Sequence, residues 1–276
     1  MSQEKPRHFW LCADDYGIAP GVNAAIRELI ARGRLNATSV MIVAPSCTPA
    51  EIDALKNAGK AAMGLHLTLT APFRPLTAGF APLAQVAFHP VQAMLRLALL
   101  RRLDRAALVR EVEAQMAAFV GAFGRPPDFI DGHQHVHLFP QVRDAVLDAA
   151  RRLAPGAWVR QCVSAVALPA RLSDPKGLLI DALSRAVRRR AQKLGLKTNP
   201  AFAGTYTYRP DADFARLFPG FLKGLPDGGL VMCHPGHIDE ELKRLDPLTT
   251  MREREYAYLS SAAFPAALEA QGLKLN

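Results

Sequence analysis

The chain has 276 residues, 50% of them hydrophobic, with a formal net charge of +9 at pH 7. This size fits one large core or two small ones, and the absence of an 18-residue apolar run excludes a membrane-spanning helix. The polar N-terminus lacks a signal-peptide pattern, and the four scattered cysteines favour buried free thiols, so we expect a protein of the reducing cytoplasm.

The first third of the chain alternates predicted strands with predicted helices. Strands are predicted at three apolar runs, residues 8–13, 37–43 and 62–69. The intervening helices are predicted at residues 22–32 and 48–57, the second with Thr48 as its N-cap.

The same alternation continues to the end of the chain. A proline-rich loop at 72–90 precedes predicted helices at 91–103, 105–123, 140–153, 178–194, 211–222 and 251–270, the last one broken near Pro265. Strands or extended segments are predicted at 129–130, 157–162, 199–210, 229–233 and 273–275. The pattern predicts a parallel sheet with right-handed crossovers in a single domain over 1–276, with 163–228 as a candidate insertion or lid region.

The stretch that most strongly indicates a function is Asp131-Gly132-His133-Gln134-His135-Val136-His137. Imidazole is the commonest protein ligand of divalent metals, and alternate residues of a strand point the same way. The pattern therefore predicts that the three histidines and the aspartate share one face. Six of the eight histidines of the chain lie in this stretch and in the motifs described next.

Three further motifs place acidic and imidazole side chains near predicted strand ends: Ala13-Asp14-Asp15-Tyr16-Gly17, Gly64-Leu65-His66-Leu67-Thr68 and Cys233-His234-Pro235-Gly236-His237. Adjacent aspartates diverge at a strand end, so that one can ligate a metal while the other stays free as a base. Each motif alone also fits a turn, a core histidine or a loop residue. Together they favour a catalytic centre of one carboxylate, two imidazoles and water. Arg160, on an apolar strand, needs a carboxylate partner if buried, and Asp14 is a candidate.

The four motifs, in this order and at this spacing, resemble those of the YdjC-like carbohydrate deacetylases. That family includes chitooligosaccharide deacetylases (ChbG) and hopanoid-biosynthesis-associated proteins (HpnK), and the form Gly-His-Gln-His-Val-His resembles the HpnK branch. The resemblance is carried by residues 8–162 and 230–237.

The resemblance implies a TIM-like (β/α) barrel, regular or distorted, and a metal-dependent hydrolase that removes N-acetyl groups from an amino sugar. It implies one divalent metal ion held by Asp15, His66 and His133, with magnesium and zinc both open. Asp14 would be the catalytic base and His234 the catalytic acid. The side chains expected to support the ligands or contact the substrate are those of Asp131, His135, His137 and Arg160.

Two other functions compete with this interpretation. The His-x-His pair also occurs in binuclear amidohydrolases that act on non-sugar amides, but there it normally closes the first strand, and Asp14-Asp15 would be left unexplained. A basic nucleic-acid-binding protein fits the net charge, but the chain has no recognised nucleic-acid motif and its aromatic residues are not interleaved with the basic runs. We therefore expect no nucleic-acid partner.

Two Arg-rich helical stretches, residues 94–105 and 178–197, combine apolar and basic side chains. Solvated basic helix faces explain them, and so does peripheral contact with an anionic membrane that brings the site to a lipid-linked amino sugar. The sequence leaves the acetylated sugar and the lipid open, together with a homodimer as an alternative to a monomer.

Overall fold

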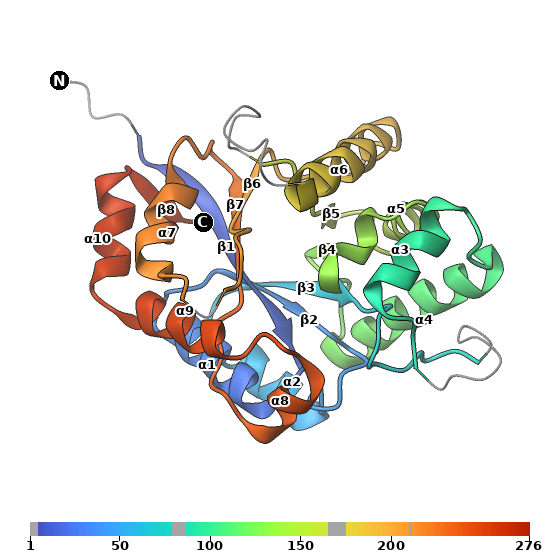
Figure 1. Cartoon of the computed structure of the whole chain (residues 1–276), viewed down its shortest axis with the longest axis horizontal. Helices are drawn as coiled ribbons and strands as arrows, with labels where there is room; N and C mark the ends of the chain where they lie inside the picture. Colours follow the sequence, from blue (N-terminus) through green and yellow to red (C-terminus); the bar gives the residue numbers. More distant parts are fainter. Residues whose placement is uncertain (1–4, 79–86, 165–174, 210) are drawn as a thin grey trace.

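A parallel sheet forms the centre of the molecule, and helices pack around it (Figure 1). The computed structural model describes residues 5–78, 87–164, 175–209 and 211–276. The strands run in the order β5-β4-β3-β2-β1-β7-β6, and β8 pairs with the start of β1. Their bounds are β1 Arg7–Tyr16, β2 Ala37–Val40, β3 Ala62–Leu67, β4 Phe129–Gly132, β5 Trp158–Val159, β6 Phe202–Ala203, β7 Gly229–Cys233 and β8 Leu273–Leu275.

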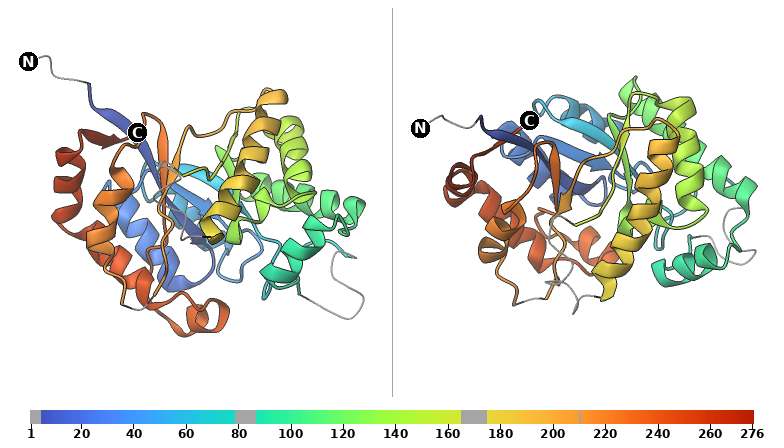
Figure 2. Two further views of the ribbon diagram at one scale, coloured as in Figure 1. Left: turned by 45° about the horizontal axis from the view of Figure 1, so that its top comes forward. Right: turned by 90° about the horizontal axis from the view of Figure 1, so that it is seen from above.

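The predicted α/β fold is confirmed, and the barrel is an incompletely closed one. The sheet curls (Figure 2), and isolated bridges bring the segments at its two edge strands, β5 and β6, next to each other. Across this seam the described residues form isolated parallel bridges, Ser164 with Phe202 and Val159 with Thr198, in place of a continuous ladder. The region 163–228 supplies β6, so part of it belongs to the sheet itself.

The helices lie mostly where the apolar pattern predicts them. Their bounds are α1 Pro20–Ala31, α2 Pro49–Lys56, α3 Val91–Leu99, α4 Arg105–Phe123, α5 Val142–Leu153, α6 Pro175–Lys193, α7 Phe214–Leu222, α8 Glu240–Leu245, α9 Thr250–Ser260 and α10 Ala263–Ala270. Thr48 caps α2 as expected, by accepting a hydrogen bond from the backbone N–H of Glu51 at 3.3 Å. Gly124, in a left-handed conformation with φ 69°, ends α4.

The helices at the C-terminal end differ from the prediction in two details. The break in the last helical segment falls at residues 261–262, between α9 and α10, whereas Pro265 lies in the first turn of α10. A proline is tolerated there because the first N–H groups of a helix have no intrahelical acceptor. The short helix α8 was not anticipated from the sequence.

The sheet register places the site residues side by side. Along β3 and β4, Gly64 is opposite Phe129 and His66 is opposite Asp131. The ring of Phe129 covers Gly64 and stacks on Trp158 with 4.4 Å between the ring centroids. The glycine therefore allows the close packing that sets the position of His66 two residues later.

The four cysteines are free, as expected; three are buried and Cys47 is half-buried. Within the described residues we find no helix of the length and apolarity needed to cross a membrane.

We expect Gly64→Ala to destabilise the fold by about 1–3 kcal/mol, because a Cβ at this position would lie 2.3 Å from a ring carbon of Phe129. Urea unfolding measures the change. The matched control is Gly121→Ala in α4, where a Cβ meets no heavy atom within 4 Å and should stabilise the helix by up to about 1 kcal/mol. Equal stabilities of the two variants would contradict the packing argument.

Candidate active site

The polar residues that the sequence singled out meet at the carboxyl ends of the parallel strands, where α/β folds assemble their sites. β1 supplies the adjacent Asp14 and Asp15, both 2% exposed. The backbone of Asp15 has φ 70°, and the register of β1 against β2 shifts between Ala13 and Tyr16. Aspartate tolerates this left-handed conformation better than most residues, and the resulting kink sends the two carboxylates in different directions.

One carboxylate, that of Asp15, joins the two imidazoles expected to be its partners. Its Oδ1 lies 2.9 Å from Nδ1 of His133 and 3.2 Å from Nε2 of His66. Ligand atoms about 2.1 Å from a common metal, at angles of 90–109°, are separated by about 3.0–3.4 Å. The three side chains are buried, and their ligand atoms all lie within 4.8 Å of one another. This donor set therefore fits a divalent ion with one oxygen and two nitrogen ligands.

Asp131 fixes the orientation of His66. Its Oδ1 lies 2.7 Å from Nδ1 of His66, which also has Oγ of Ser39 at 2.9 Å. Burial lowers the pKa of His66, but Asp131 and the hydrogen bond with Asp15 raise it to about 10. The site thus attracts positive charge at the ring. A proton on Nδ1 donated to Asp131 leaves Nε2 to bind a cation, an arrangement common among metal-ligating histidines.

The second carboxylate of the pair, Asp14, is held by Arg160. The guanidinium Nη1 lies 2.6 Å from Oδ2 of Asp14 and Nη2 lies 2.7 Å from Oδ1, while Nη2 is also 2.6 Å from Oδ2 of Asp131. Burial raises the pKa of Asp14, but Arg160 outweighs it and holds that pKa well below its usual range. Asp14 is therefore ionised, and the expected pairing with Arg160 is confirmed.

The expectation of a shared histidine face is wrong. β4 ends at Gly132, and His133–Leu138 forms a 3-10 turn in which Gln134 and His135 have φ of 52° and 59°. The strand periodicity is lost, so the three imidazoles point in different directions. Only His133 reaches Asp15.

The other two histidines of the cluster have separate environments. His135 lines the cleft, with its Nδ1 3.8 Å from Sγ of Cys162. His137 is fully buried, and burial followed by the neighbouring His135 and Arg160 holds its pKa well below the usual value. Its Nε2 lies 3.1 Å from the carbonyl oxygen of Arg160. We interpret this contact as an N–H donated to that carbonyl, which supports the backbone of the arginine.

His234 follows β7 and faces the cleft. Its Nδ1 is 3.4 Å from the hydroxyl of Tyr208, and the two rings meet edge to face. Burial lowers its pKa more than the charges of Asp15 and Asp14 raise it. The backbone N–H of His234 donates to the buried carboxylate of Glu255, which also accepts a hydrogen bond from Tyr206.

Sequence reasoning missed two buried charged residues of α9. Nη2 of Arg252 lies 2.6 Å from Oδ2 of Asp15 and 2.7 Å from Oδ2 of Asp246. Burial raises the pKa of Glu255 to about 7. No local pattern signals them, because apolar and polar residues of α9 are hardly segregated around the helix axis and the burial of these two side chains follows from how α9 packs in the fold.

A cleft of about 660 Å³ opens above these groups. Its polar floor contains Asp14, Asp15, His66, His133 and His234. Its walls are largely apolar and come from α3, α6 and the segment after α8: Val91, Leu95, Leu179, Ile180, Leu183 and Leu248.

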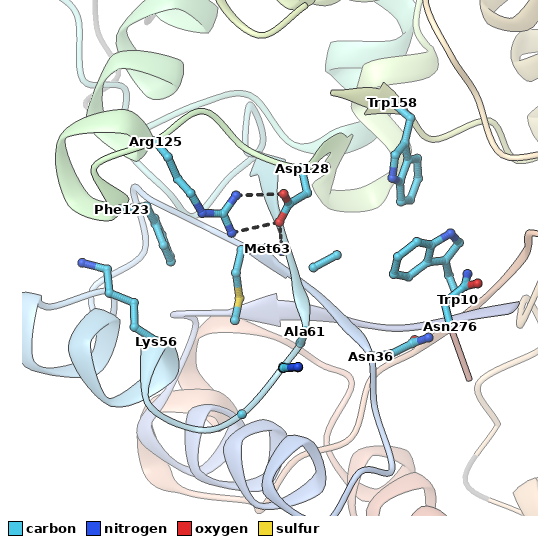
Figure 3. A pocket seen from close by; sticks show the side chains of 13 residues that line it. Trp10, Asn36, Lys56, Ala61, Met63, Phe123, Arg125, Asp128, Trp158 and Asn276 are labelled. Atoms are coloured by element: carbon cyan, nitrogen blue, oxygen red, sulfur yellow. Dashed lines mark hydrogen bonds and ion pairs between the residues drawn. The ribbon is translucent and has the colours of Figure 1, made fainter. Parts of the chain in front are cut away.

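A second hollow lies at the opposite, amino-terminal end of the strands (Figure 3). Trp10 and Trp158 line it with 6.2 Å between their centroids, and Arg125 and Asp128 form a two-bonded ion pair beside them. None of the predicted site residues reaches it. The cleft at the carboxyl ends is therefore the candidate active site.

Comparisons with known proteins place the chain in a family and identify relatives that match nearly its whole length. A family model described as "YdjC-like protein" matches residues 8–270. The chain is 27% identical over 280 residues to a chitooligosaccharide deacetylase of Citrobacter koseri, covering 96% of this chain and 95% of that protein. It is 28% identical over 269 residues to the chitooligosaccharide deacetylase of Yersinia pestis, with the same coverage.

A solved structure shares the fold. The structure of a candidate cellobiose-phosphate cleavage protein from Enterococcus faecalis superimposes with a TM-score of 0.76 at 21% sequence identity, covering 99% of this chain and 97% of that one. The curled parallel sheet is thus a fold already observed by crystallography.

We expect Arg160→Met to lower the free energy of unfolding by about 3–5 kcal/mol at pH 7, because it leaves buried carboxylates without their cation. Since the folded pKa of Asp14 lies below its usual 3.8, the ion pair stabilises the fold above about pH 4 and is lost as the pH falls through the folded pKa. The difference in the free energy of unfolding between Arg160→Met and the wild type should therefore become smaller at acidic pH. Urea unfolding at several pH values measures it.

The control for this measurement is Arg190→Met, which removes an ion pair to Asp144 from a side chain that is 56% exposed. We expect this exposed pair to contribute less than about 1 kcal/mol. An equal loss in the two variants would contradict the special role of the buried pair.

Proposed function

The chain belongs to the YdjC-like family, and from this we propose that it is a metal-dependent deacetylase that hydrolyses the N-acetyl group of an amino sugar. The observation that carries the proposal is the cluster of Asp15, His66 and His133 next to the separate carboxylate of Asp14. The names of the relatives from Citrobacter koseri and Yersinia pestis, which cover nearly the whole chain, support an acetylated oligosaccharide as the substrate class. The assignment to the HpnK branch stays a prediction.

In this proposal one divalent ion, magnesium or zinc, is held by Asp15, His66 and His133. Such an ion supplies Lewis-acid polarisation of the acetyl carbonyl and acidifies a water molecule. The protein positions the ligands in advance: Arg252 occupies Oδ2 of Asp15 and leaves Oδ1 for the ion, while Asp131 orients His66. Three protein ligands leave room for water and substrate.

Asp14 is the proposed base that takes the proton of the attacking water. Its Oδ1 accepts from Arg160 at 2.7 Å and from Ser39 at 3.3 Å, whereas Oδ2 accepts only from Arg160 among the described residues. A carboxylate oxygen has two acceptor directions. We therefore infer that Oδ2 receives the proton, and that Arg160 prevents the carboxylate from rotating.

His234 is the proposed acid that protonates the departing amine, since an amide nitrogen leaves poorly as an anion. Its place in the same cleft as the proposed metal ligands and its contact with Tyr208 support this role. Because burial favours the neutral imidazole, the proposal requires His234 to act from the protonated form that the nearby carboxylates stabilise.

A lipid-linked amino sugar is the finer proposal for the substrate. A free sugar is polar throughout, but the walls of this cleft are built from aliphatic side chains of α3 and α6 above a polar floor. An amphiphilic molecule can place its sugar on the floor and an apolar part between the walls.

The competing amidohydrolase chemistry needs two metal ions. A second group of candidate ligand atoms exists, from Cys12, Asp14 and Asp131. Arg160 already lies among them, with its Nη2 2.6–3.0 Å from ligand atoms of all three residues. A buried guanidinium at this position supports a single metal ion.

We expect acetate release from a panel of free, oligomeric and lipid-linked N-acetylated amino sugars, abolished by a chelator and restored by a divalent metal. Asp14→Asn should retain the metal and lose about 10²–10⁴ in kcat. His133→Ala should lose the metal itself. Metal content per chain and acetate release are measured on each variant; full activity of Asp14→Asn would refute the assignment of the base.

For the acid, we expect His234→Ala to lose amide hydrolysis but to keep most of its activity on an activated acetate ester such as 4-nitrophenyl acetate. The nitrophenolate leaves without protonation, so it does not need an acid. Initial rates on the two substrates, at equal metal content, measure the difference. Parallel loss on both substrates would show that His234 has another role.

A further inference from the structure

The end of α3 presents exposed leucines surrounded by arginines. Leu99 and Leu100 are 51% and 56% exposed, the highest fractions among the large hydrophobic side chains that the structure describes. Arg96, Arg101 and Arg102 are exposed around them, and none of the three forms an ion pair with a described residue. We call these five residues the leucine tip. Within the described residues, these three cations are not neutralised by an ion pair, and the two leucines leave about half of their surface exposed.

The backbone at the leucine tip is hydrogen-bonded and departs from the usual sequence preference. Arg102 N–H donates to the carbonyl of Leu97 at 2.8 Å and Arg101 N–H to that of Ala98 at 3.1 Å, the two bonds of a Schellman cap. The left-handed residue of such a cap is usually glycine, but here it is Arg101, with φ 54°. An arginine at a position that favours glycine suggests that its side chain has a function.

The leucine tip is continuous with the wall of the cleft. Val91, Leu95 and Leu99 are spaced four residues apart and so form one apolar stripe along α3. Val91 and Leu95 line the cleft, as does Leu179 near the start of α6, which is 40% exposed. In the right-hand view of Figure 2, α3 and the first turns of α6 lie on the same side of the molecule.

The anchoring of the connection keeps the leucines exposed. The backbone N–H of Leu103 donates to Oε1 of Gln141 at 3.1 Å, and its carbonyl accepts from Nε2 of the same side chain at 3.0 Å. These two bonds hold the end of the link, just before α4, on the body of the protein. The leucines therefore remain at the surface without a partner element within the described chain.

We propose that the leucine tip binds the surface of an anionic lipid bilayer and brings the mouth of the cleft to that surface. Leu99 and Leu100 would enter the boundary between headgroups and acyl chains, and the arginines would contact lipid phosphates. The charge of the leucine tip argues against two other occupants. A second copy of the chain would place arginines against arginines, which repel each other, and nucleic acid would bind the arginines but leave the leucines without an apolar partner. This membrane contact is additional to the proposed deacetylation, and none of the observations that support it depends on that reaction.

The test is co-sedimentation of the full chain with vesicles of phosphatidylcholine alone and of phosphatidylcholine mixed with phosphatidylglycerol. We expect binding to the anionic vesicles, weakened by salt. Leu99→Ser and Leu100→Ser should each lower the partition coefficient about tenfold. Arg102→Gln should lower it about fivefold. Turnover is not measured in this experiment, so its result is independent of the proposed reaction.

Arg101→Gly separates function from folding. Glycine suits the left-handed cap, so the melting temperature should stay equal or rise, while vesicle binding should fall about fivefold with the lost charge. The matched control is Arg188→Gln with Arg189→Gln, two exposed arginines of α6 away from the leucine tip, which should leave binding at the wild-type level.

Three outcomes would overturn the proposal. The first is no binding of the wild type to anionic vesicles, and the second is binding that the α6 control reduces as much as the tip variants do. The third is a dimer in solution that the leucine substitutions dissociate, since the occupant would then be a second copy of the chain.

Discussion

The buried cation of Arg160 is the interaction on which the arrangement of the site depends. It joins Asp14 of β1 to Asp131 of β4, and Asp131 in turn orients His66 of β3. Three strands are thereby linked through one guanidinium with no exposed surface. Such a group is costly to desolvate, and the planar, two-bonded contact with Asp14 is the geometry in which an arginine recovers that cost.

The two adjacent aspartates can both remain ionised because each has its own arginine. Arg160 neutralises Asp14, and Arg252 of α9 neutralises Asp15 from the opposite side. Like charges on consecutive residues would otherwise raise one of the two pKa values. The two carboxylates also have different partners. Oδ1 of Asp15 contacts the imidazoles of His66 and His133, whereas Asp14 contacts neither ring.

Much of the fold was predictable from the sequence, because alternating strands and helices have distinct apolar periods. The helix Arg105–Phe123 illustrates this: its apolar period and its closing Gly124 fix both its type and its end. The site was predictable to the extent that its residues lie in short motifs at strand ends. Asp14, Asp15, His66 and His234 are all of this kind, and the structure brings them to one cleft floor, where Arg160 pairs with Asp14.

The remainder depends on backbone turns and on long-range contacts that a local pattern does not contain. His133 was expected to share a face with His135 and His137, but left-handed conformations at Gln134 and His135 separate them, and neither of these two positions is a glycine that would indicate the turn. Arg252 lies 237 residues from Asp15, so its role emerges only when α9 packs onto the sheet.

The same reasoning explains why composition alone was a poor guide to partners. The net charge of +9 suggests a polyanion, but the cations differ in what they do. Arg160 and Arg252 are buried and neutralise the carboxylates of Asp14 and Asp15, whereas the arginines of the leucine tip are exposed and unpaired among the described residues. Only cations of the second kind contribute to attraction at the surface, and their position beside leucines selects a phosphate surface with an apolar interior. The charged residues therefore have to be located in the fold before the net charge supports any conclusion about binding partners.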